Sequence, residues 1–85
     1  MTKRTTTLDL AIRVKQLNAE LENAYVEVVH KDKGYVLELW ERNDEYEYYL
    51  MDLSPRVSKA MISHILYAIR GVLTATKGGN YGLPE

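Results

Sequence analysis

Two short turns divide the middle of this chain into three segments with the character of β-strands. Residues 31–34 contain a glycine that can adopt the positive φ of a tight turn, and residues 42–44 form the second turn. The predicted strands are Tyr25–His30, Tyr35–Glu41 and Glu45–Leu53. Because turns this short join antiparallel neighbours, the sequence predicts a three-stranded antiparallel meander.

The hydrophobic pattern also predicts how the strands align. We place Glu27 opposite Glu38, and Glu38 opposite Tyr49. One face then carries Val26, Val28, Leu37, Leu39, Tyr48 and Leu50, and the other carries Tyr25, Glu27, Val36, Glu38, Trp40, Glu47, Tyr49 and Met51. The first set is an apolar core and the second is mixed, as in a sheet covered on one side. The alternative is a bulge at Gly34 that pairs Val28 with Glu38, and we favour the alignment without it.

Helical periodicity is present on both sides of the sheet. Thr6 and Asp9 approximate a capping box. After them, an apolar stripe recurs at helical spacing, formed by Leu10, Val14, Leu17, Leu21 and Ala24, while Leu8 and Ile12 form a second apolar spot opposite it. At the other end, Ser54 is the predicted N-cap of a second helix, with Pro55 at the first helical position. This helix should run to about Thr76 and stop at Gly78-Gly79.

The elements together predict one α+β domain, residues 1–85, in the order α-β-β-β-α, with both helices packed on one face of the sheet. Residues 1–6 are expected to be a loose N-terminal tail, and residues 78–85 a flexible C-terminal tail.

The last helix carries an apolar arc that covers about half of its circumference. The arc consists of Val57, Met61, Ile62, Ile65, Leu66, Ile69, Val72 and Leu73, and small side chains at Ala60, Ala68, Gly71 and Ala75 extend it. One sheet face does not normally cover so wide an arc. We therefore expect the first helix to cover part of it, or a second copy of the chain in a homodimer.

Charge is distributed unevenly along the chain. Residues 25–53 hold eight acidic and three basic side chains, a net charge of 3 − 8 = −5, whereas residues 54–85 hold four basic side chains and one acidic, a net of 4 − 1 = +3. The absence of cysteine excludes disulfides and thiolate metal sites. No apolar stretch approaches the roughly 20 residues that span a bilayer. We expect a soluble cytoplasmic protein with no membrane contact, no cofactor and no metal.

Catalysis finds little support in this sequence. Ser63 and His64 are adjacent on a predicted helix, so their side chains diverge by about 100° and do not form a nucleophile–base pair. Glu27 and Glu38 face each other in the predicted alignment, but a flat sheet offers no pocket around them. We therefore expect that the protein is not an enzyme, and that both histidines are structural.

The uncovered sheet face is the better candidate for binding. Tryptophan and tyrosine are typical anchors of protein interfaces, whereas the glutamates between them would repel the phosphates of a nucleic acid. The predicted protein-binding residues are Glu27, Glu38, Trp40, Glu47 and Tyr49. The alternative is a nucleic-acid-binding protein that uses a basic stripe on the last helix, formed by Arg56, Lys59, Arg70 and Lys77.

The order α-β-β-β-α is also that of double-stranded-RNA-binding domains, but residues 54–59 lack their lysine cluster and residues 31–34 lack their Gly-Pro-x-His loop. In size and compact order the chain resembles small accessory proteins of phages and plasmids, some of which inhibit host defence nucleases, anti-CRISPR proteins among them. That resemblance implies a non-enzymatic inhibitor that binds a host protein through an acidic surface.

Overall fold

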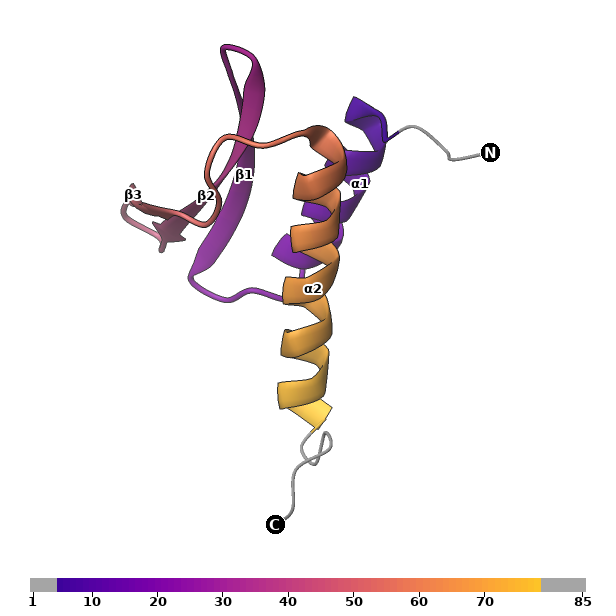
Figure 1. The fold of residues 1–85 in the computed structure, drawn as a ribbon. Coiled ribbons are helices and arrows are strands. Elements are labelled where there is room, and N and C mark those ends of the chain that lie inside the picture. Colours follow the sequence, from indigo (N-terminus) through magenta and orange to yellow (C-terminus); the bar gives the residue numbers. More distant parts are fainter. Residues whose placement is uncertain (1–4, 79–85) are drawn as a thin grey trace.

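The computed structural model describes residues 5–78. Its elements are α1 (Thr7–Asn18), β1 (Ala24–Lys31), β2 (Gly34–Arg42), β3 (Glu47–Asp52) and α2 (Lys59–Gly78). The predicted α+β architecture is confirmed, because the three strands form one antiparallel sheet in the order β1-β2-β3. Both helices lie on the same side of the sheet, and β3 is the strand farthest from them (Figure 1).

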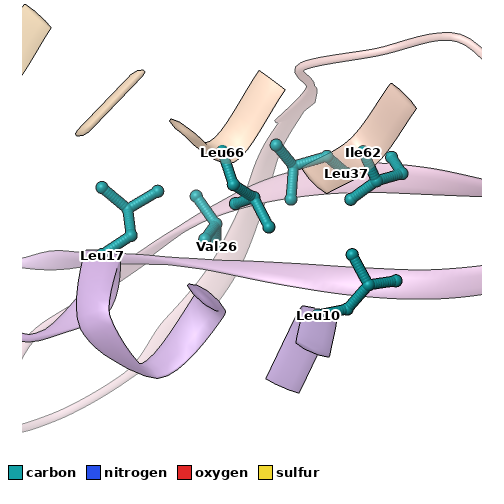
Figure 2. Close-up of a cluster of buried hydrophobic side chains, with 6 residues drawn as sticks. All are labelled: Leu10, Leu17, Val26, Leu37, Ile62 and Leu66. Carbon is teal, nitrogen blue, oxygen red and sulfur yellow. The ribbon is translucent and has the colours of Figure 1, made fainter. Parts of the chain in front are cut away.

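The core lies between the two helices and the first two strands. It is formed by Leu10 and Leu17 of α1, Val26 of β1, Leu37 of β2, and Ile62 and Leu66 of α2 (Figure 2). Leu17, Leu37 and Ile62 have no exposed surface, and burying each stabilises the fold by about 1.5–3 kcal/mol. All six residues of β3 are exposed, so the helices leave this strand uncovered.

Helix α1 begins as predicted and ends earlier than its apolar stripe suggests. The capping box is present, with the Asp9 N–H donating to Thr6 Oγ1 (3.1 Å) and the Thr6 N–H donating to Asp9 Oδ2 (2.9 Å). The helix stops at Asn18, whose side-chain amide accepts from the Val26 N–H (2.7 Å) and donates to the Val26 carbonyl (3.1 Å). The expectation that helical periodicity continues to Ala24 is wrong, because that residue opens β1.

The first hairpin has the predicted alignment, with Glu27 opposite Glu38 and no bulge at Gly34. The expected role of the glycine is wrong, however, since Asp32 is the residue of this turn with a positive φ (53°). Gly34 is buried beneath the side chain of Arg56 and the carbonyl of Val57, and a Cβ there would clash with the Arg56 stem. A close approach of another segment therefore accounts for this glycine.

The second hairpin differs from the predicted alignment. Glu38 lies opposite Asp52, Trp40 lies opposite Tyr49, and a register shift falls between Leu39 and Trp40. The cause is a longer turn: the Asn43 side chain accepts from the N–H groups of residues 45 and 46 (2.8 and 3.1 Å), so β3 starts at Glu47. An asparagine that bonds the backbone two or three residues ahead is a common turn device. Tyr48 lies opposite Glu41, on the side of Leu39 as predicted, but Tyr48 and Leu50 are both exposed and do not belong to the core. The predicted place of Met51 on the other face is wrong, because Met51 lies opposite Leu39.

The start of α2 differs as well, because Ser54 is not its N-cap. Ser54 is buried, and its Oγ accepts from the Leu37 N–H (3.0 Å). Val57 then exchanges two backbone hydrogen bonds with Tyr35 (2.8 Å each). Residues 54–57 thus satisfy backbone groups of the central strand, and a helix that began at Ser54 could not do this. Ser58 is the cap instead, since its Oγ accepts from the Met61 N–H (3.2 Å).

Candidate functional site

The sheet face that points away from the helices carries a row of three aromatic rings, one from each strand. Tyr25 lies opposite Trp40, and Trp40 lies opposite Tyr49. The rings of Tyr25 and Trp40 are stacked with centroids 6.1 Å apart, and the rings of Trp40 and Tyr49 meet edge to face at 6.0 Å. Both arrangements are favourable for aromatic pairs. We call these three residues the aromatic row.

Each member of the aromatic row donates a hydrogen bond to a carboxylate. Trp40 Nε1 donates to Glu38 Oε1 (3.0 Å). The Tyr25 hydroxyl donates to Glu47 Oε1 (3.1 Å), and the Tyr49 hydroxyl donates to Asp52 Oδ1 (2.8 Å). Hydrogen bonds to ionised acceptors are stronger than neutral ones. The rings are therefore held in place before any partner arrives, which reduces the entropic cost of binding.

The carboxylates shift the acid–base behaviour of the tyrosines. The hydrogen bond to Asp52 raises the pKa of Tyr49 above its ordinary value of 10.0, and desolvation adds to the effect. Desolvation raises the pKa of Tyr25, and the hydrogen bond to Glu47 raises it further. Both hydroxyls are therefore neutral donors near pH 7.

The five predicted protein-binding residues share this face, but they are not equally available to a partner. Glu27 and Glu47 are exposed, Tyr49 is 46% exposed and Trp40 is half-buried. Glu38 is only 8% exposed, and it lies between the Trp40 indole and the Lys31 ammonium, whose Nζ is 3.7 Å from Glu38 Oε2. Glu38 thus positions Trp40 and offers little surface of its own.

The opposite side of β3 carries a second group of aromatic and acidic side chains that sequence reasoning missed. The hydroxyls of Tyr46 and Tyr48 both donate to Glu41 (3.3 and 3.2 Å), and their rings are stacked at 5.1 Å. The negative charge of Glu41 raises the pKa of Tyr48, with a smaller effect from desolvation. The available signal was composition, because residues 45–48 alternate glutamate with tyrosine, and residues 45–49 lack the Val and Leu of the other two strands.

The predicted basic stripe is largely engaged within the molecule. The assignment of Arg56 to the last helix is wrong, because Arg56 precedes α2 in the segment that pairs with β2 at Tyr35. Arg70 Nε donates to Glu20 Oε2 (2.7 Å), and Arg70 Nη1 donates to Gln16 (3.3 Å). Arg56 Nη1 lies 3.7 Å from Asp32 Oδ2, and Lys59 Nζ lies 5.6 Å from the centroid of the Tyr35 ring. The side chain of Lys77 lies outside the described part of the structure.

Chemistry of other kinds has few candidates among residues 5–78. The structure brings no three His, Asp or Glu side chains of this range together as a metal site. His30 stacks on Tyr35 with centroids 4.7 Å apart, and His64 is exposed. A groove of about 580 Å³ between α1 and α2 is lined by Arg13, Gln16, Leu66, Tyr67, Ala68, Arg70, Gly71, Val72, Thr74 and Ala75, with no carboxylate or imidazole among them. No helix within the described range is long and apolar enough to cross a membrane.

Fold and face together define a small α+β domain with a structured acidic and aromatic surface on an uncovered sheet. Comparisons with protein-family models, with curated proteins and with solved structures gave no match.

Proposed function

We propose that this protein is a non-enzymatic binding module that docks through its open sheet face onto a positively charged surface of another protein. The observation that carries the proposal is the aromatic row, whose three rings are fixed by three carboxylates on a face that neither α1 nor α2 covers (Figure 1). Rigid aromatic anchors that bring little entropic cost are typical of protein-binding surfaces. The exposed carboxylates of Glu27 and Glu47 on this face would attract a basic partner and accelerate its association.

An inhibitor of a host factor, such as a defence nuclease, is the partner relationship that suits this surface best. Proteins that bind nucleic acid present basic patches, and an acidic face fixed in shape can occupy such a patch. The carboxylates of Glu27 and Glu47 would supply the charge, and Tyr49 and Trp40 the apolar contact. This relationship agrees with the resemblance to small accessory proteins of phages and plasmids.

Self-association through α2 is a further part of the proposal. Tyr67 and Val72 are 69% and 64% exposed, and they flank the small residues Ala68 and Gly71. The Arg13 guanidinium lies over the Tyr67 ring at 5.9 Å, and the rest of this helix face borders an open groove beside α1. Sedimentation over a range of concentrations tests this, with Val72→Glu as the variant that should remain monomeric. A wild-type protein that stays monomeric at high concentration would overturn the homodimer and leave the sheet-face proposal intact.

Capture of a partner from a lysate of the native host tests the sheet face. We expect the double variant Glu27→Lys with Glu47→Lys to lose the partner, because it reverses the exposed charge of the face. Glu22→Lys is the matched control, since Glu22 is exposed outside the sheet, and it should retain the partner. If the double variant is folded by circular dichroism and still captures the partner as wild type does, the sheet face is not the binding site.

Nucleic-acid binding by α2, together with Arg56 in the segment before it, is the alternative function. It predicts affinity that falls steeply with salt, through Arg56, Lys59, Arg70 and Lys77. The pairing of Arg70 with Glu20 and of Arg56 with Asp32 would have to be given up to free these cations for phosphate. A gel shift with duplex DNA, duplex RNA and single strands at low salt decides the matter, and absence of a shift at micromolar protein would remove this alternative.

A further inference from the structure

The two edges of the sheet differ in how their backbone groups are satisfied. At the outer edge of β1, the Asn18 side chain bonds both the N–H and the carbonyl of Val26 and so blocks that position. At the other edge, β3 has no neighbouring strand in the described range. Open edges are places where a further strand can pair, and proteins usually protect them. The sheet is thus blocked at one position of its β1 edge, whereas the β3 edge is open within the described range.

The hydrogen-bonding pattern identifies which backbone groups of β3 face the open edge. The Asn43 N–H donates to the Tyr46 carbonyl (3.0 Å), so this pair bonds across the hairpin. The Arg42 N–H instead points toward the β1 side and donates to the carbonyl of Asn23, the residue just before β1 (2.9 Å). Glu47 lies opposite Arg42. Bonded and non-bonded pairs alternate along antiparallel strands. The backbone groups of Glu47 and, two residues on, of Tyr49 therefore point outward.

A second copy of this chain is a poor occupant of the open edge. Residues 38–52 hold six acidic side chains and one basic, a net charge of 1 − 6 = −5. An antiparallel pairing of β3 with itself would bring Glu47 of one copy toward Asp52 of the other, and like charges on facing strands are destabilising. Charge complementarity calls for a basic segment.

The surroundings of the edge also suit cationic side chains. On one side of the sheet, Tyr49 of the aromatic row and Glu47 lie on β3 itself. On the other side lie Tyr46 and Tyr48, whose hydroxyls donate to Glu41 of the central strand. The molecule already shows how such a surface holds a cation: the Arg42 guanidinium lies over the Tyr25 ring at 5.1 Å, beside the Glu47 carboxylate that this tyrosine bonds. An extended partner with Lys or Arg at successive positions would place cations on both sides of the sheet, because side chains alternate along a strand.

From these features we infer that β3 takes up a Lys- and Arg-rich extended segment of the partner protein as a fourth strand. The inference rests on the proposed function and names the chemistry of its partner. Main-chain hydrogen bonds to Glu47 and Tyr49 supply pairing, as in other cases of strand addition, and the flanking carboxylates and rings select basic side chains.

The test uses a synthetic nonapeptide, three repeats of Lys-Lys-Thr with blocked termini, added to the full chain. As a strand, this peptide presents Lys on both sides of the sheet. Amide hydrogen exchange and ¹⁵N chemical shifts follow the N–H groups of Glu47 and Tyr49. We expect both amides to become protected. The same peptide, N-methylated at its central residues, keeps its charge but cannot pair through the backbone. We expect its affinity to be lower by a factor of at least about ten. An uncharged Ser and Thr nonapeptide should not bind.

Three results would overturn strand addition. They are no binding of the Lys and Thr peptide, equal affinity for the N-methylated peptide without amide protection, and protection of Glu47 and Tyr49 by self-association in the absence of peptide. The first two leave the sheet-face proposal standing if the Glu27→Lys and Glu47→Lys double variant still loses the cellular partner. Retention of that partner by the double variant removes the proposed function whatever the peptide does.

Discussion

Replacing Ser54 with alanine separates the observed role of this residue from the helix-capping role that its sequence context suggests. The Leu37 N–H donates to Ser54 Oγ (3.0 Å), and Leu37 has no exposed surface. Ser54→Ala therefore leaves a buried donor without a partner, which costs about 1–3 kcal/mol. For a domain of this size, 2 kcal/mol lowers Tm by on the order of 10 °C. Urea unfolding should show a lower midpoint with an unchanged slope.

Two serines of the same segment serve as controls. Ser58→Ala removes the observed N-cap and should cost about 1 kcal/mol, while Ser63→Ala lies within α2 and should be neutral or slightly stabilising, since alanine is the better helix former. If Ser54 were the N-cap instead, Ser58 would be a helix-interior residue and Ser58→Ala would not destabilise. A neutral Ser54→Ala, or a stabilising Ser58→Ala, would refute the structural assignment of α2.

Three further predictions concern the sheet. Asn18→Ala removes two backbone hydrogen bonds at the edge of β1 and should cost about 1–3 kcal/mol, with faster amide exchange in that strand as the measurement. Trp40→Phe takes the indole donor from the Glu38 carboxylate and should cost about 1.5–3 kcal/mol, and a double-mutant cycle with Glu38→Gln should show strong non-additivity in urea unfolding. The pKa of Tyr49 is raised in the folded protein, so the stability that its hydroxyl contributes is complete below pH 10.0 and is lost as pH rises through the raised value. Asp52→Asn should lower this pKa in a titration followed by tyrosine ring NMR. An unchanged pKa would contradict the assigned cause.

The candidate site was predictable in position and only partly in detail. Strand alternation and the first hairpin place Glu27, Glu38 and Trp40 on the uncovered face, and the structure has them there. The burial of Glu38 was not predictable, because it depends on Trp40 and Lys31 closing over it from different parts of the sheet. The exposure of Tyr48 was missed for a related reason, since an alternating pattern cannot say how far the helices reach across a sheet.

The sequence alone determined the features that depend on residues close together in the chain. The period of the apolar residues decided which segments are helices or strands and in what order, and contacts across three residues decided the capping box at Thr6. Only the tertiary structure decided which serine caps α2 and which strand stays uncovered. The first outcome depends on the central strand, whose buried N–H at Leu37 must find an acceptor, and Ser54 supplies it from 17 residues away. The second depends on how far the two helices reach across the sheet.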